Sequence, residues 1–162
     1  MQIDLKRLAE FLVKAKKSTY ASVDSMNIKP ERSGFKELEF CADGLYYRDS
    51  YCGFYSAPGM EVVRLENKEG KPVWTMSYSG GMSKEYHGEK QFTLSVFSFL
   101  KKVLENVQSD KPFRGPGMKE GDFEYSSKIN GDISEFSGEE KIIYKGKVVF
   151  RQFFSGGFVV EK

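Results

Sequence analysis

The chain of 162 residues contains few of the residues that most often carry chemistry, with one histidine and two cysteines. It has no apolar run near the roughly 20 residues that a membrane-spanning helix needs. Its 25 Lys and Arg residues nearly balance 23 Asp and Glu residues and form no basic stripe. The N-terminal stretch MQIDLKRLAE carries charges where a signal peptide has its apolar core. We therefore expect a cytoplasmic protein that does not bind nucleic acid or membranes directly, and its oligomeric state stays open.

Motifs for catalysis and for metal or cofactor binding are also missing. His87 is the only histidine, which excludes a His-rich metal site. Together with Glu85 and Glu89 it would form a metal cluster only on a strand, and Gly88 interrupts such a strand, so a surface loop is the favoured interpretation. The chain has no GxSxG elbow and no phosphate-binding P-loop. The sequence thus indicates no catalytic residues, no metal and no cofactor, although it leaves catalysis itself open.

The two cysteines can be placed by the turn between them. Asp43-Gly44 lies between two strand-like runs and predicts a two-residue hairpin turn. In that register Cys41 lies opposite Tyr46, and Cys52 lies about 20 Å further along its strand. Since a disulfide needs Cα atoms within about 7 Å, the cysteines cannot pair. We expect two reduced thiols, with a structural role favoured over a redox role.

One strand-like sequence occurs twice in the chain. Residues 70–82 (GKPVWTMSYSGGM) and 146–158 (GKVVFRQFFSGGF) are identical at six of thirteen positions. Other stretches match in the same order: 29–34 with 111–117, 44–53 with 121–131, and 59–63 with 138–142. This common order predicts an internal duplication, with residues 1–162 forming a single domain of two repeats at about 3–82 and 91–159. The alternative is that both halves merely share the composition of β-hairpins.

The periodicity of apolar residues predicts helices over 3–17 and 91–107. Runs of strand-forming residues between turn signals predict strands at 37–42, 45–52, 60–66, 72–79, 121–129, 132–136, 140–145 and 147–155. Asn130-Gly131 and Lys145-Gly146 are further candidate hairpin turns. Each half then consists of one helix followed by an antiparallel meander. The predicted fold is α+β, with two main helices and a mostly antiparallel sheet.

The repeated strand presents an aromatic face. With a period of two, Trp74, Met76 and Tyr78 point to one side, and their counterparts are Phe150, Gln152 and Phe154. This face should point inward, either as a packed core or as the wall of a cavity. Gln152 favours a cavity, because an amide among rings needs hydrogen-bond partners. With the two matched glutamates as charged partners, the candidate ligand-binding residues are Trp74, Tyr78, Phe150, Gln152, Phe154, Glu61 and Glu140.

Several segments resemble a prokaryotic domain family of unknown function. They are FLVKAKKSTYA (11–21), YRDSYCGFYSAPGMEVVRLENKEGKPVWTMSYSGG (47–81), KPFRGP and GDISEFSGEEKIIYKGKVVF. In that family the domain occurs alone or behind a helix-turn-helix segment, and the first 25 residues here supply only one good helix. The resemblance implies a sensor or effector-binding module and assigns no active-site residues. Drug-sensing GyrI-like domains are similar only at the level of fold class, since their element order differs.

Three functions are compatible with the sequence. The leading one is a non-enzymatic domain that binds a small, partly apolar molecule between the two halves, with Glu61 and Glu140 favouring a cationic or hydroxyl-bearing ligand. The second is a small enzyme that uses Glu or Tyr side chains for acid–base chemistry, which a carboxyl group with a strongly raised pKa in a cleft would favour. The third is a protein-interaction module with an exposed strand edge, which an extended apolar surface patch would favour.

Overall fold

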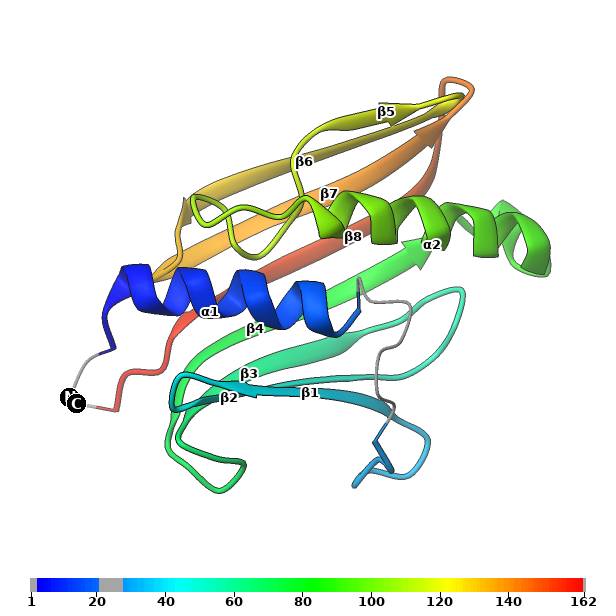
Figure 1. Cartoon of the computed structure of the whole chain (residues 1–162). Helices are drawn as coiled ribbons and strands as arrows, with labels where there is room; N and C mark the ends of the chain where they lie inside the picture. The colour runs from blue at the N-terminus through cyan, green and yellow to red at the C-terminus, as the bar shows by residue number, and fades with distance from the viewer. Residues whose placement is uncertain (1–2, 21–27, 162) are drawn as a thin grey trace.

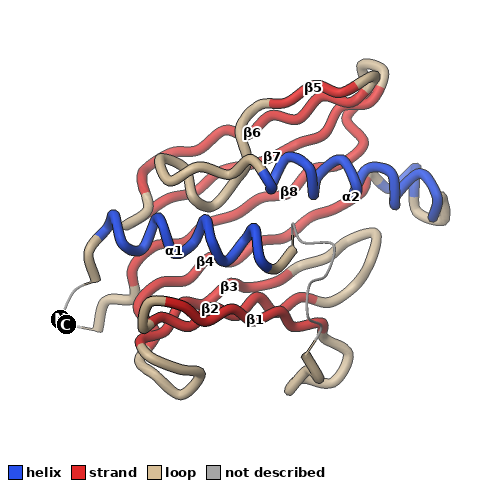
Figure 2. Tube along the Cα trace, in the orientation of Figure 1, coloured by secondary structure: helices blue, strands red, loops and turns tan. Residues whose placement is uncertain are grey.

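The computed structural model describes residues 3–20 and 28–161, in which two α-helices lie on one face of an eight-stranded antiparallel sheet (Figures 1 and 2). The helices are α1 (Leu5–Ser18) and α2 (Lys90–Glu105), with a short 3₁₀ turn, η1 (Lys84–Tyr86), before α2. The strands are β1 (Lys36–Ala42), β2 (Leu45–Tyr51), β3 (Gly59–Leu65), β4 (Pro72–Met82), β5 (Met118–Glu120), β6 (Phe123–Asp132), β7 (Glu135–Tyr144) and β8 (Lys147–Phe158). The predicted α+β fold is confirmed.

The sheet places the two halves of the chain side by side. Its strand order is β1-β2-β3-β4-β8-β7-β6-β5, so the fourth strand of each half lies in the middle. The central pairing sets Trp74 opposite Phe158, Tyr78 opposite Phe154 and Met82 opposite Phe150. The repeated sequence therefore occupies β4 and β8, and the pairing is centred on Tyr78 and Phe154. That the halves arose by duplication stays a prediction, which superposition of one half on the other would test.

The two helices approach each other over the middle of the sheet. In Figure 1 they enter from opposite sides, so that their C-terminal ends converge above β4 and β8. Helix α1 is capped by Asp4, whose side chain accepts a hydrogen bond from the Arg7 amide at 2.9 Å. The helices differ from the predicted 3–17 and 91–107 by one or two residues at each end. Their C-terminal turns leave a space between sheet and helices that holds the candidate site.

The predicted turn at Asp43-Gly44 is confirmed. Ala42 pairs with Leu45 and Cys41 with Tyr46, and both cysteines are free. The φ angles of Asp43 and Gly44 are 53° and 68°, a combination that two-residue hairpin turns with a type I′ backbone require. The turn at Lys145-Gly146, which joins β7 to β8, is confirmed as well.

The predicted turn at Asn130-Gly131 is wrong. Strand β6 continues through both residues to Asp132, and the turn is formed by Ile133 and Ser134. The reason is the side chain of Asp132, which accepts hydrogen bonds from the Ser134 amide at 2.8 Å and from the Ser134 hydroxyl at 2.5 Å. Such local aspartate bonds stabilise a turn directly after the aspartate. This turn chemistry prevails over the Asn-Gly signal.

The predicted strands 132–136 and 140–145 are likewise replaced by one continuous strand, β7. Gly138, at the predicted break, lies within the strand and pairs with Phe154. A Cβ atom at this position would lie 2.7 Å from the Phe154 ring, so only glycine lets the ring pack against the strand. The short edge strand β5 has no counterpart in the predicted set.

The inner face of the sheet carries two apolar clusters, one beneath each helix. The cluster near α1 contains Trp74, Phe113, Phe136 and Phe154, and the cluster near α2 contains Val96, Val103, Tyr125, Ile142 and Phe150. The predicted inward face of β4 and β8 is therefore confirmed by burial. The outer face is open, as the 54% exposure of Phe153 shows. Neither these helices nor any other helix within residues 3–20 and 28–161 combines the length and hydrophobicity of a membrane span.

Candidate functional site

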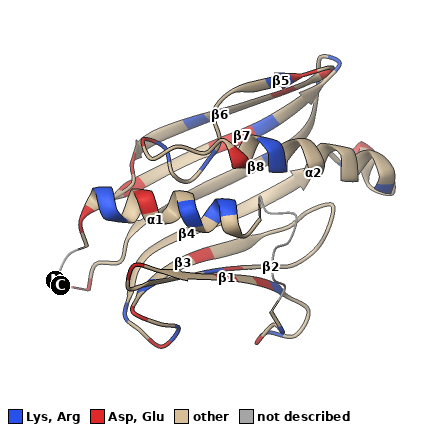
Figure 3. Ribbon diagram, in the orientation of Figure 1, with Lys and Arg blue, Asp and Glu red and all other residues tan. Residues whose placement is uncertain are grey.

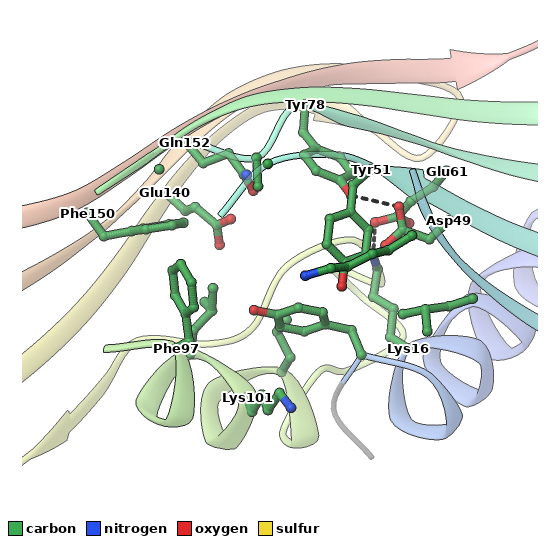
Figure 4. A pocket seen from close by; sticks show the side chains of 18 of the residues that line it. Lys16, Asp49, Tyr51, Glu61, Tyr78, Phe97, Lys101, Glu140, Phe150 and Gln152 are labelled. Carbon is green, nitrogen blue, oxygen red and sulfur yellow. Dashed lines mark hydrogen bonds and ion pairs between the residues drawn. The ribbon is translucent and has the colours of Figure 1, made fainter. Parts of the chain in front are cut away.

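A cavity of about 500 Å³ lies between the inner face of the sheet and the C-terminal parts of α1 and α2 (Figure 4). This volume is within the range of typical small-molecule sites, ~300–1,000 Å³. Its charged lining residues are Lys16, Lys36, Asp49, Glu61, Lys101, Arg114 and Glu140. Its aromatic lining residues are Tyr20, Tyr47, Tyr51, Phe54, Tyr78, Phe97 and Phe150. The cavity thus combines flat rings with several charged groups.

Glu61 and Glu140 occupy matching positions in the two halves. Glu61 on β3 pairs with Met76 of β4, and Glu140 on β7 pairs with Gln152 of β8. Met76 and Gln152 are themselves counterparts in the repeated strand. Both glutamates are almost fully buried, at 3% and 2% exposure. The fold therefore sets two carboxylates into the same wall of the cavity, on either side of its central strands.

Lys16 neutralises Glu61. Its ammonium group donates hydrogen bonds to both carboxylate oxygens of Glu61, at 2.6 and 2.7 Å (Figure 4). Lys16 follows Leu12 by one helical turn, which puts it on the buried face of α1. Burial lowers the pKa of Lys16, although the charge of Glu61 opposes this effect. A buried pair of this kind costs desolvation energy and is weak support for stability alone.

Arg114, in the segment between α2 and β5, connects both glutamates. Its Nε atom lies 3.1 Å from Glu140 Oε1, and its Nη1 atom lies 3.9 Å from Glu61 Oε1. The Nε contact is an ion pair without hydrogen-bond alignment, and Nε has no hydrogen-bond partner among the described residues. Nη2 donates to Gln152 Oε1 at 3.3 Å, and the guanidinium lies 4.5 Å from the centre of the Phe154 ring. Gln152 thus has the partner that its burial requires.

Gly115, directly after Arg114, lies close against helix α2. A Cβ atom on Gly115 would lie 2.6 Å from the backbone oxygen of Val103 in α2. The chain therefore passes closer to the helix than any other residue would permit.

Asp49 is the third buried carboxyl group that lines the cavity and is 5% exposed. It lies on β2 opposite Glu61 of β3, and the Tyr78 hydroxyl donates a hydrogen bond to its Oδ1 at 2.7 Å (Figure 4). Within residues 3–20 and 28–161, no basic side chain forms an ion pair with it. Burial, followed by the charge of Glu61, raises the pKa of Asp49 to about 7. Asp49 therefore exchanges a proton near neutral pH.

Basic side chains cover two of the tyrosines that line the cavity. The Lys36 ammonium lies 5.8 Å from the centre of the Tyr51 ring, and the Lys101 ammonium lies 5.8 Å from the centre of the Tyr20 ring. Both distances suit a cation–π contact. Each of these two rings therefore already has a positively charged neighbour.

Five of the seven predicted site residues line the cavity: Glu61, Tyr78, Glu140, Phe150 and Gln152. Trp74 and Phe154 do not line it, because both are packed within the core. The Trp74 ring stacks on Phe136 with 5.7 Å between ring centres, and its Nε1 donates to the Ile133 carbonyl at 2.9 Å.

Sequence reasoning missed Lys16, Asp49 and Arg114, which hold the charges around the predicted glutamates. Each carries a signal that could have revealed it. Asp49 alternates with Tyr47 and Tyr51, which places it on their face of β2. Lys16 falls on the apolar stripe of its helix, and Arg114 belongs to the matched stretch 111–117. Among the described residues, no cluster of His, Cys, Asp and Glu suits a metal ion.

Comparison with known proteins gives a family but no function. A family model described as a domain of unknown function, DUF5680, matches residues 49–159. The matched range begins at Asp49, includes Glu61, Arg114 and Glu140, and leaves out Lys16. Neither curated proteins nor solved structures gave a significant match. Because the family model covers more than half of the sequence, the chain belongs to the DUF5680 family, whose function is unknown.

Proposed function

We propose that this domain binds a small, partly apolar molecule in the cavity beneath its two helices. The observation that carries the proposal is the cavity itself: about 500 Å³ in which buried carboxyl groups lie among aromatic side chains. Flat rings give a ligand large contact area at low entropic cost, and a few polar groups set its orientation. Tyr78, Phe150 and Gln152 would contact the ligand, with Glu61 and Glu140 as its charged surroundings.

The cost of this arrangement supports a functional role. Three carboxyl groups and two basic groups are buried together, where well-packed apolar residues would usually be as stable or more stable. Polar clusters in cavities are typical of binding sites, since they give specificity rather than stability. Basic and acidic residues both occur along α1, so this helix forms no uniformly basic stripe of the kind that binds nucleic acid (Figure 3). We propose a sensor or effector-binding role in the cytoplasm.

Occlusion of the cavity tests this proposal. The neutral fluorescent dye Nile red should bind the wild-type protein with increased emission, because the cavity offers aromatic walls. Ser98 lines the cavity from α2, so Ser98→Trp should fill it and reduce dye binding at least tenfold. Ser95 is exposed on the same helix and does not line the cavity, so Ser95→Trp is the matched control. Equal dye binding by both variants, or none by the wild type, would contradict the proposal.

A second candidate function is acid–base catalysis. It is favoured by Asp49, whose pKa of about 7 would allow it both to donate and to accept a proton at neutral pH. The Tyr78 hydroxyl, within hydrogen-bond distance, could stabilise either form. Native mass spectrometry would identify a co-purified molecule, which could then be incubated with the wild type and with Asp49→Asn. Conversion to a product by the wild type alone would establish an enzyme, and an unchanged mass would support binding only.

A further inference from the structure

We infer that the ligand is an organic cation, an amine or quaternary ammonium group on an apolar body, and that Asp49 is the carboxylate that receives it. This inference rests on the proposed function and adds the chemical class of the ligand and the residue that recognises it. The buried charges that line the cavity do not balance. Asp49, Glu61 and Glu140 stand against only two buried basic residues, Lys16 and Arg114.

The two basic residues are already paired with the glutamates. Lys16 binds Glu61 through both carboxylate oxygens, and Arg114 lies 3.1 Å from Glu140. Asp49 has the hydroxyl of Tyr78 and, among the described residues, no basic partner. The buried part of the cavity is therefore one positive charge short when Asp49 is ionised. Lys36 and Lys101 also line the cavity, but they are not buried, and their ammonium groups lie over the rings of Tyr51 and Tyr20. A ligand with a single positive charge would remove this deficit.

The remaining walls of the cavity also favour a cation. Tyr47 and Tyr51 flank Asp49 on β2, and both line the cavity. Cations are attracted to the faces of such rings, and cages of aromatic residues recognise ammonium groups. The C-terminal ends of α1 and α2, which carry the negative end of the helix dipole, converge over the same space (Figure 1). The aromatic rings, the carboxylate and the helix dipoles thus all favour a positively charged ligand.

Protonation of Asp49 couples this binding to pH. The titratable groups that influence Asp49, or are influenced by it, are Lys16 of α1, Tyr20 after α1, Tyr47 and Tyr51 of β2, Glu61 of β3, Tyr78 of β4 and Arg114 before β5. The neighbouring strand β1 and helix α2 add Lys36 and Lys101, which line the same cavity. Burial keeps Asp49 partly protonated at neutral pH. An ammonium group beside it would favour the ionised form, so a proton should leave when the ligand binds.

Isothermal titration calorimetry with a matched pair of probes tests the inference. The probes are 4-phenylbutylamine, which is cationic throughout the range used, and the neutral 4-phenylbutanol. For a carboxyl group titrating near pH 7, amine affinity should rise about tenfold from pH 6 to pH 8, while alcohol affinity stays constant. Titration at pH 6 in buffers of different ionisation enthalpy should show release of about 0.9 protons per amine bound.

Two variants make the outcome decisive. Asp49→Asn keeps the shape of the side chain and its bond with Tyr78, and it should lose the proton release and the pH dependence of amine affinity. Ser127→Ala, at the matching position of β6, should retain both. Equal binding of amine and alcohol without proton release would overturn the inference and leave the proposed function intact. Failure of both probes to bind would overturn the two together.

Discussion

The two halves of the sheet hold a glutamate at the same position but surround it differently. Glu61 has a second carboxyl group, Asp49, opposite it on the neighbouring strand, whereas Glu140 has Ser127 in that place. The Tyr125 hydroxyl donates to Glu140 at 2.7 Å, and the charge of Glu140 is met by Arg114. The second half is therefore balanced in charge, and the first half carries the excess carboxyl group.

The arginines at matching positions of the two halves also have different surroundings. Arg114 belongs to the matched stretch 111–117, and its counterpart in 29–34 is Arg32. Arg32 is exposed, with its guanidinium 5.5 Å from the centre of the Phe35 ring, while Arg114 is buried at the centre of the sheet. The Arg114 guanidinium lies 5.8 Å from the centre of the Tyr78 ring and 4.5 Å from the centre of the Phe154 ring. The guanidinium at this central pair thus comes from the second half alone, and the site at the junction of the halves is asymmetric.

The largest expected effect is the difference in stability loss when Trp74 and its counterpart in the repeated strand, Phe150, are each replaced by alanine. Trp74→Ala should lower the free energy of unfolding by about 3–5 kcal/mol, because the ring is packed on all sides in the core. Phe150→Ala should cost clearly less, because that ring borders the cavity. Urea unfolding of both variants measures the difference. Equal losses would show that the wall at Phe150 is packed as tightly as the core.

The next largest effect is the difference in stability cost between replacing Arg114 and replacing its counterpart Arg32. Arg114→Ala leaves buried Glu140 without its cation and should cost about 3 kcal/mol or more. Arg32→Ala removes an exposed side chain and should change stability by less than about 0.5 kcal/mol. Chemical denaturation again provides the measurement. A small loss for Arg114→Ala would mean that Glu140 does not depend on the guanidinium for its stability in the folded protein.

A smaller effect concerns the pH dependence that Asp49 introduces into the first half. Its pKa is about 7 in the folded protein and 3.8 in its ordinary state, so between these values the folded chain binds more protons than the unfolded chain. Stability should therefore fall as pH rises through this window, by about 2 kcal/mol between pH 5 and pH 7. Asp49→Asn should lack this decline, and Ser127→Ala should keep it. Thermal unfolding at several pH values measures the stability of all three proteins. The same dependence of stability on pH in the wild type and in both variants would contradict this prediction.

Much of the fold could be predicted because its determinants are local. The Asp43-Gly44 turn depends on two adjacent residues that tolerate positive φ, and the inward face of β4 and β8 depends only on alternation. The matched glutamates were found by aligning the stretches 59–63 and 138–142 of the two halves. At Asn130-Gly131 the local signal failed, because the side chain of Asp132 formed a competing turn two residues later.

The sequence by itself thus determined both helices, most of the strands, the free cysteines and the aromatic face of the central strands. Only the tertiary structure decided which side chains meet in the cavity. Lys16, Asp49 and Arg114 come from a helix, a strand and a connecting segment far apart in the chain, and no local pattern sets the distances between them. The raised pKa of Asp49 likewise exists only in the folded protein, because it results from burial beside Glu61 and both follow from the assembled sheet.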